Sequence, residues 1–231
     1  MSFAPEGPMA VPLWINGRAF LTVTEEFFDV VDPVKGEAIR RVPLCGADEA
    51  AEAVAAAAAA GKPWGDLAAD ARQALLGALA KALDDYTGHF AKLIRQETGK
   101  EESDAVAEVQ AAVAALRGAQ AGTAGVLVAI ADAGRPLAGL VELAAPVLAA
   151  GGTVVVKPSP KAPGAAYAFC ELTARAGWPA GVVNLVQGDE AAVTGLCAQT
   201  GVSRVAYAGE AVLGERIAAI AAGHGKAFLA A

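Results

Sequence analysis

Cysteine and histidine are scarce in this chain of 231 residues. The three cysteines, Cys45, Cys170 and Cys197, lie far apart and form no CxxC pair, which argues against a disulfide scaffold and against a zinc module. The two histidines, His89 and His224, leave little room for a metal site or for histidine-based acid–base catalysis. Because unpaired cysteines suit a reducing compartment, we expect a cytoplasmic protein without a bound metal.

Long apolar runs and an excess of basic residues are also missing. No segment shows the basic start, apolar core and small-residue cleavage site of a signal peptide, and no uninterrupted run of about 18 apolar residues predicts a membrane span. The chain has 18 Lys and Arg against 25 Asp and Glu, a net charge of -7, whereas a nucleic-acid groove normally needs a basic patch. We therefore expect neither nucleic acid nor a membrane as a partner.

What the chain does contain is alanine, at 59 positions, against seven Phe, three Trp and three Tyr. Alanine favours helices, and small side chains let helices approach closely. The pattern predicts one unit over 1–231 with three parts: extended segments in 1–45, helices in 46–118, and alternating strands and helices in 125–231. Asn16-Gly17, between two apolar runs in 13–20, predicts a hairpin.

Helix boundaries in the second part follow from capping residues and breakers. Asp48 is a good N-cap for an alanine-rich helix, which we expect Gly61 and Pro63 to terminate. Asp66 then opens a longer helix whose apolar stripe leaves Arg72 outside the core.

Short apolar runs alternate with helical segments in the third part. Runs of this kind are too uniformly apolar for half-exposed strands, so we expect buried parallel strands. They cover 126–130, 153–156, 182–186, 203–207 and 227–229, with helices over 137–150, 163–176, 190–199 and 211–222. This order predicts an α/β fold with a Rossmann-like, doubly wound parallel sheet, on which the amino-terminal hairpin and helices pack. Ligands should then bind at the carboxyl ends of the strands.

Two of the loops at those strand ends carry candidate ligand contacts. Lys157, followed by Ser159, ends one strand and could donate to a ribose or a phosphate, although a solvated lysine is the plainer interpretation. Gly209 leads into a helix whose free N–H groups suit a pyrophosphate, but the turn lacks the GxGxxG fingerprint. Glu210 stands at the N-cap, where we expect its carboxylate to take those N–H groups and to repel a phosphate.

Several motifs in this order resemble the aldehyde dehydrogenase superfamily. The hairpin at 13–20, the stretch 32–36 and Glu97-Thr98-Gly99-Lys100 are similar to its amino-terminal motifs. The stretch 151–160, GGTVVVKPSP, resembles the family's "GNTVVLKPSE", and 177–188, GWPAGVVNLVQG, resembles its "GFPPGVVNVV.G".

The resemblance implies the family's NAD(P)-binding domain. Lys157 would meet the adenosine ribose, and Gly209 with its helix would face the pyrophosphate. Together the resemblance and the strand-end loops give six candidate cofactor contacts: Lys157, Ser159, Gly188, Gly209, Glu210 and Leu213.

The same alignment implies that the catalytic machinery is missing. Gly134 stands where the family has its oxyanion-stabilising asparagine, and Ala230 stands at the general-base glutamate. The catalytic cysteine and its domain would lie beyond residue 231, so no residue is assigned a catalytic role. Pro160 replaces an acidic ribose contact and Glu210 a serine that touches phosphate, so binding of NAD or NADP should be weak or lost.

Three functions fit these features. The first is a non-catalytic pseudoenzyme that acts as an accessory or regulatory subunit, inactive alone, with a protein partner over the surface left by the absent catalytic domain. The second is the NAD(P)-binding subunit of an aldehyde oxidoreductase completed by another chain. The third is a structural interaction protein.

Overall fold

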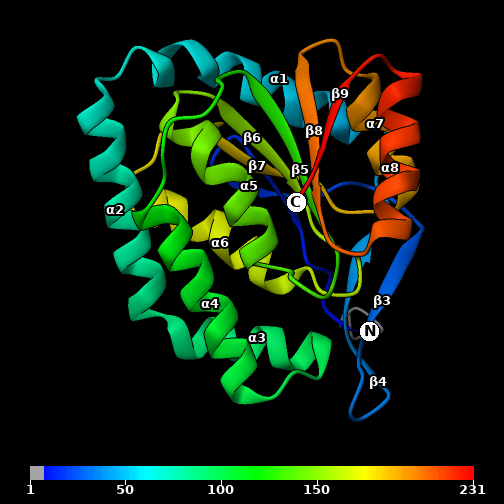
Figure 1. Ribbon diagram of the computed structural model, residues 1–231. Helices are drawn as coiled ribbons and strands as arrows, with labels where there is room; N and C mark the ends of the chain where they lie inside the picture. The colour runs from blue at the N-terminus through cyan, green and yellow to red at the C-terminus, as the bar shows by residue number, and fades with distance from the viewer. Residues whose placement is uncertain (1–7) are drawn as a thin grey trace, which may run out of the picture.

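A seven-stranded sheet forms the centre of the computed structural model, which describes residues 8–231 (Figure 1). The strand order is β2-β1-β7-β6-β5-β8-β9. Strands β5 to β9 are parallel to one another in every pair that they form among themselves. The bounds of these strands are β1 Leu13–Ile15, β2 Arg18–Phe20, β5 Val126–Ala131, β6 Thr153–Lys157, β7 Val183–Leu185, β8 Val202–Ala208 and β9 Ala227–Ala230. The predicted doubly wound parallel sheet is confirmed.

Helices cover both faces of this sheet (Figure 1). Their bounds are α1 Ala47–Gly65, α2 Ala69–Asp85, α3 Thr87–Thr98, α4 Glu102–Arg117, α5 Ala138–Ala149, α6 Gly164–Arg175, α7 Glu190–Ala198 and α8 Ala211–Gly223. The side chains of α2 to α6 share one buried apolar cluster, while those of α7, α8 and most of α1 share a second cluster on the opposite face. The buried side chains of β5 and β6 alternate between the two clusters, so these strands separate them.

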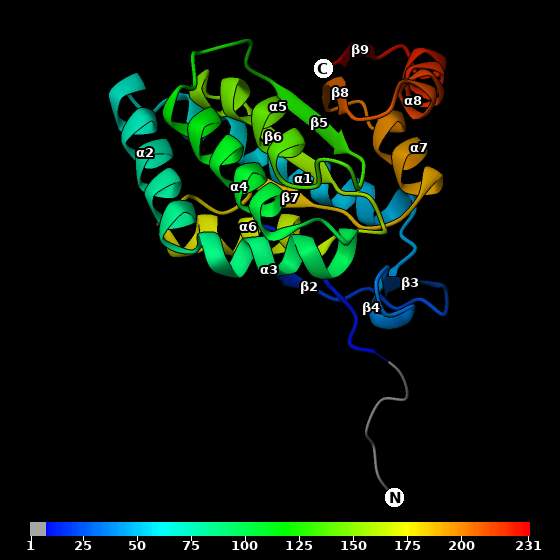
Figure 2. The same ribbon diagram turned by 60° about the horizontal axis from the view of Figure 1, so that its bottom comes forward.

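The amino-terminal hairpin extends the sheet rather than packing on it. Asn16 and Gly17 have φ angles of +52° and +75°, the positive values that a type I′ turn requires. Trp14 of β1 then pairs antiparallel with Leu185 of β7, so the hairpin forms one edge of the sheet. A second hairpin, β3 Phe27–Asp32 with β4 Glu37–Pro43, lies apart from the sheet (Figure 2).

The predicted boundaries of α1 are wrong at both ends. Gly46, not Asp48, is the N-cap, and the Glu49 carboxylate accepts its backbone N–H at 3.0 Å. The helix continues through Gly61 and Pro63 to Gly65, so Asp66 ends α1 instead of opening α2. Trp64 holds this last turn in place, because its ring is fully buried and its indole N–H donates to the Leu148 carbonyl at 3.0 Å.

Two predictions of burial are also wrong. Arg72 is buried on α2, because its guanidinium donates to the backbone carbonyls of Gly65, Leu67 and Ala149. Strand β9 is exposed, because it lies at the sheet edge with β8 as its one paired neighbour. No helix within residues 8–231 combines the length and the apolar character needed to cross a bilayer.

Candidate functional site

The sheet changes its winding direction between β5 and β8. Strands β5, β6 and β7 follow one another toward one edge, whereas β8 and β9 lie on the other side of β5. In doubly wound sheets the crevice at such a switch point, beyond the carboxyl ends of the strands, is where ligands bind. Here this crevice lies between Ala131-Asp132 and Ala208-Gly209, since Ala131 pairs with Ala208.

A cavity of about 340 Å³ opens beside this crevice, between α7 and α8. Three of the six predicted contacts, Lys157, Ser159 and Leu213, line it together, and Pro160 lies next to them. The remaining lining residues are Ile130, Ala131, Asp132, Asp189, Glu190, Val193, Arg216, Ile217 and Ile220. Two strand-end residues and one helix residue from the predicted set thus share one cavity, whose apolar walls include further residues of α7 and α8.

Lys157 is 4% exposed at the end of β6, although its side chain is a cation. Its ammonium group donates one hydrogen bond, to the Pro158 carbonyl at 3.1 Å, out of the three that it can make. Burial lowers the pKa of Lys157 to about 8, and the Asp189 carboxylate acts in the opposite direction. The plain interpretation of a solvated lysine is wrong, because this amine is enclosed at the cavity.

Acidic groups outnumber basic groups around the cavity. Asp132, Asp189 and Glu190 carry carboxylates, and the cations are Lys157 and Arg216. The Arg216 guanidinium is already paired with Glu190 at 2.5 Å, an ion pair that joins α8 to α7. The cavity consequently offers a negatively charged lining to a ligand.

Asp132 is the residue that the sequence interpretation missed as a site residue. Its Oδ2 accepts the backbone N–H of Glu210 at 2.8 Å and lies 3.4 Å from the Tyr207 hydroxyl. Its Oδ1 accepts the N–H groups of Gly134 at 2.8 Å and Arg135 at 3.3 Å. One carboxylate thus bridges the ends of β5 and β8.

Gly209 and Glu210 occupy the turn opposite Asp132. The φ angle of Gly209 is +154°, and a Cβ there would collide with the Asp132 carboxylate and the Tyr207 hydroxyl, so a side chain cannot be accommodated. Glu210 is the N-cap of α8, but its carboxylate makes no capping hydrogen bond. Our expectation that Glu210 satisfies this helix end is wrong, since Asp132 accepts the N–H of Glu210 instead.

Gly188 does not line the cavity. Its φ angle is +121°, and a Cβ there would lie 2.9 Å from the Cys45 backbone nitrogen and 3.0 Å from Ala192. The glycine therefore allows close packing between the loop after β7 and the chain before α1.

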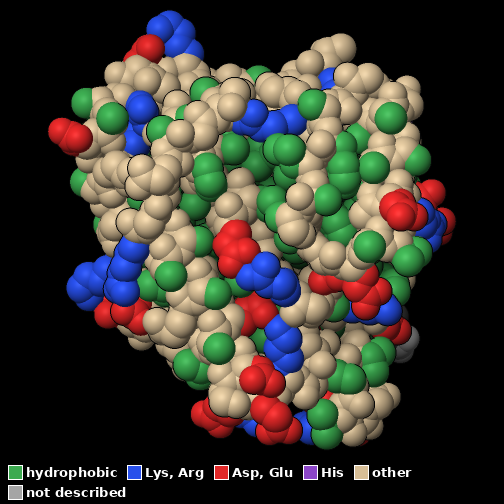
Figure 3. All heavy atoms as spheres, viewed as in Figure 1, with side chains coloured by type: hydrophobic (Ala, Val, Ile, Leu, Met, Phe, Trp, Pro, Cys, Tyr) green, Lys and Arg blue, Asp and Glu red, His purple; other side chains and the backbone are tan. Residues whose placement is uncertain are grey.

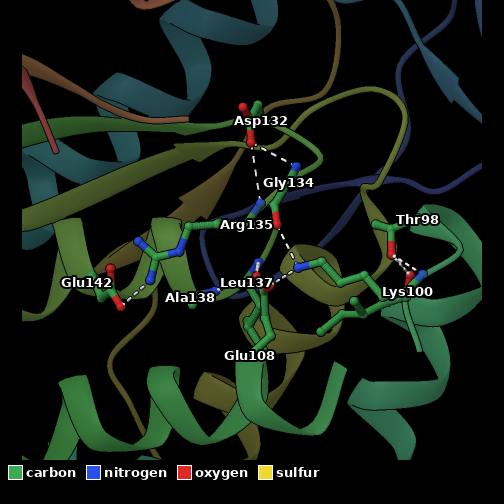
Figure 4. A network of polar contacts seen from close by, with 10 residues as sticks. Thr98, Lys100, Glu108, Asp132, Gly134, Arg135, Leu137, Ala138 and Glu142 are labelled. Carbon is green, nitrogen blue, oxygen red and sulfur yellow. Dashed lines mark hydrogen bonds and ion pairs between the residues drawn. The ribbon is translucent and has the colours of Figure 1, made fainter. Parts of the chain in front are cut away.

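The loop after β5, where the family asparagine would stand, is held by a polar network that includes the buried Glu108 (Figure 4). Glu108 of α4 accepts the N–H groups of Leu137 and Ala138 at 3.1 and 3.2 Å and pairs with Lys100. The Lys100 ammonium also donates to the Gly134 carbonyl at 2.6 Å. The N–H and the carbonyl of Gly134 are therefore both hydrogen-bonded, to Asp132 and to Lys100, and glycine adds no side-chain donor.

The residues considered for covalent or acid–base chemistry lie elsewhere. Ala230 pairs with Tyr207 at the carboxyl end of β9 and brings no carboxylate. All three cysteines are buried, and burial raises the pKa of Cys45 to about 12 and also raises the pKa of Cys170. Within residues 8–231, no group of three or more His, Cys, Asp or Glu side chains could hold a metal ion.

Comparison with known proteins gives this fold a family. The model of the "Aldehyde dehydrogenase family" matches residues 20–126 and 120–231. The NADP⁺-dependent succinate-semialdehyde dehydrogenase of Escherichia coli K12 is 31% identical over 227 residues, which cover 88% of this chain and 47% of that protein. The chain thus spans about half the length of the curated relatives that it matches.

Solved structures agree with this match. Lactaldehyde dehydrogenase from Escherichia coli superposes with a TM-score of 0.89 at 27% identity, over 96% of this chain and 52% of that one. Indole-3-acetaldehyde dehydrogenase from P. syringae, in complex with NAD⁺, gives a TM-score of 0.87 at 27% identity, over 94% and 50% of the two chains. The sequence motifs, the sheet order and these matches together show that the chain belongs to the aldehyde dehydrogenase family.

Proposed function

We propose that this chain is an accessory, non-catalytic member of the family that does not oxidise aldehydes alone. The observation that carries the proposal is the state of Gly134. Stabilisation of an oxyanion requires a donor aimed at the developing charge, and removing one such donor typically costs about 10²–10³ in kcat. The backbone N–H of Gly134 donates to Asp132 instead, and glycine has no side-chain amide that could stabilise an oxyanion.

The residue at the expected general-base position supports the same proposal. A base must lie within hydrogen-bond reach of the proton that it abstracts. The position that aligns with the family glutamate holds Ala230, beside Tyr207, whose own pKa is raised to about 12 by burial and then by the Asp132 carboxylate. A phenol with that pKa stays protonated at neutral pH and is a poor base.

Weak or absent binding of NAD or NADP is part of this proposal. The cavity retains Lys157, Ser159 and apolar walls, which support contact with the adenosine part of a nucleotide. At the phosphate-facing turn, Asp132 and Glu210 add negative charge where the helix N-terminus would otherwise attract an anion.

An NAD(P)-binding subunit completed by another chain is the second candidate, and one surface feature favours it. Hydrophobic side chains gather over β5, β8 and β9 (Figure 3). Leu229 of β9 is 56% exposed and Val212 of α8 is 73% exposed. An apolar surface beside a strand edge that is unpaired within residues 8–231 commonly marks a protein contact, which supports a partner at this surface.

Titration with cofactors and a turnover assay test the accessory role. We expect no aldehyde-dependent NADH or NADPH formation by the purified chain, and calorimetric dissociation constants for NAD⁺ and NADP⁺ no tighter than about 1 mM. Glu210→Ser should tighten NAD⁺ binding by about ten-fold, because a charge beside the phosphates is removed. Glu215→Ser on the same helix is the matched control and should leave binding unchanged.

Two outcomes would contradict this proposal. Turnover of an aldehyde by the isolated chain would overturn the non-catalytic role. Micromolar NAD⁺ binding by the unaltered chain would instead favour the cofactor-binding subunit.

A further inference from the structure

Two chemically different groups of side chains line the cavity between α7 and α8, at the carboxyl ends of the neighbouring strands β5 and β6. One end is formed by Asp132, which reaches across from β5 to the turn before α8. The other strand end, that of β6, holds the Lys157 amine and the Ser159 hydroxyl, and apolar side chains of α7 and α8 line the rest of the cavity. A ligand that fits must match both ends together.

At the first end, this chain's own carboxylate occupies the position suited to an anion. The N–H of Glu210 points at Asp132 Oδ2 at 2.8 Å, and Gly209 admits that contact because it has no side chain. A phosphate that approached this turn would have to displace Asp132 from four donors: the N–H groups of Gly134, Arg135 and Glu210 and the Tyr207 hydroxyl. It would also meet the exposed Glu210 carboxylate.

At the second end, the polar groups are suited to hydroxyl groups. The Lys157 ammonium is 4% exposed and has one hydrogen-bond acceptor, the Pro158 carbonyl, so it retains capacity to donate. Val193 of α7 faces the cavity along with Leu213 and Ile217 of α8, which provides apolar contact for a flat ring. About 340 Å³ is within the range that encloses small organic ligands.

We propose that Asp132 is a specificity-determining residue that closes the phosphate-facing end of this cavity, so that the site selects an uncharged nucleoside over its phosphorylated forms. The base would lie between the apolar walls of α7 and α8, and the sugar hydroxyls would meet Lys157 and Ser159. This inference rests on the nucleotide cavity of the proposed function and goes further by naming the ligand class.

The test compares adenosine with ADP as calorimetric probes of the unaltered chain and of Asp132→Asn. In the unaltered chain we expect adenosine to bind at least about ten-fold more tightly than ADP, a difference of about 1.4 kcal/mol. Asparagine keeps an acceptor for Gly134 and Arg135 but removes the charge, so ADP should bind about ten-fold more tightly while adenosine changes less than about two-fold.

Asp189→Asn is the matched control. Asp189 lines the same cavity and carries the same charge, but its carboxylate caps α7 through the Ala191 N–H at 3.0 Å and does not contact the turn before α8. The gain in ADP affinity should be clearly larger for Asp132→Asn. Equal gains in the two variants would show a general effect of cavity charge and would overturn the assignment to Asp132.

A measurement on the unaltered chain covers the case in which Asp132→Asn does not fold. Salt screens repulsion between partly exposed charges, so raising ionic strength should narrow the gap between ADP and adenosine. A constant gap would contradict the charge repulsion that we infer.

The outcomes also separate this inference from the accessory role. ADP binding as tight as adenosine binding, or no adenosine binding at millimolar concentration, would overturn the nucleoside selectivity and leave the non-catalytic role standing. Aldehyde turnover would overturn the accessory role and leave the selectivity of the cavity standing.

Discussion

Lys157 carries an ionisable amine in a position where little water reaches it. Taking a charge out of water is unfavourable, and burial is the first cause of its lowered pKa of about 8. An unfolded lysine has a pKa of about 10.4, so between about pH 8 and pH 10.4 the unfolded chain binds more protons than the folded one. The contribution of Lys157 to the free energy of unfolding therefore rises with pH across that window.

Lys157→Met tests this linkage. We expect the variant to be more stable than the unaltered chain at pH 7, by up to roughly 3 kcal/mol, and the difference to shrink as pH rises from 8 toward 10.4. Urea denaturation of both proteins at several pH values measures it. Lys92→Met, at an exposed lysine, is the control for loss of one positive charge, and its pH dependence should be clearly smaller than that of Lys157→Met. A Lys157→Met difference that stayed constant with pH would contradict the buried, shifted amine.

The amino-terminal end of α5 depends on a side chain from another helix. Glu108 of α4 accepts two N–H groups at that end, and its carboxylate is 4% exposed. The Lys100 ammonium pairs with it and also binds the loop before α5. The Arg135–Glu142 pair at 2.6 Å joins the same loop to α5, but both of its side chains are more exposed.

The two carboxylates should differ sharply in their contribution to stability. Glu108→Ala leaves two helix N–H groups and Lys100 without their acceptor, and breaking a buried pair from one side costs about 3–5 kcal/mol. Glu142→Ala should cost less than about 1 kcal/mol, as exposed pairs do. Thermal or urea unfolding of the two variants gives the comparison, and similar losses would refute the role of Glu108 as the cap of α5.

The apolar periodicity within single elements was enough to predict the alternation of strands and helices. It also placed Lys157 and Ser159 at the end of a strand. Contacts between distant segments were not accessible in the same way. Asp132 and Glu210 are 78 positions apart along the chain. They meet only because β5 pairs with β8. Arg72 is buried by carbonyls that include Ala149, and Pro63 stays helical because Trp64 is anchored to Leu148.

Both edge strands of the sheet, β2 and β9, are largely exposed, and β9 is the edge on the side of the candidate site. Strand β9 pairs with β8 on one side, and its residues are largely exposed. Leu229 of this edge is exposed, as are Val212 and Leu213 in the first turn of α8. Within residues 8–231 no strand pairs with the outer side of β9, and such an edge can accept a further strand.

Leu229→Lys tests the partner surface, because a charged side chain on an edge strand opposes pairing. Size-exclusion chromatography of native extracts should find the unaltered chain in a larger complex, and the variant should shift to the elution position of the free chain. Cross-links from Lys226, which precedes β9, should identify the partner face. Val34→Lys, at a position that is 80% exposed on the separate hairpin, should leave the complex intact. A complex that survives Leu229→Lys would place the contact elsewhere.

The three tryptophans all belong to the apolar cluster on the α2–α6 side of the sheet. Trp64 and Trp178 stack with ring centroids 4.9 Å apart, and Trp14 lies edge-on to Tyr167. The cluster beneath α7 and α8 contains no tryptophan among its residues and has Tyr207 instead. Tryptophan fluorescence therefore reports on one side of the sheet. Far-ultraviolet circular dichroism reports on the secondary structure of the whole molecule. Unfolding curves measured by the two methods coincide only if both sides of the sheet unfold together.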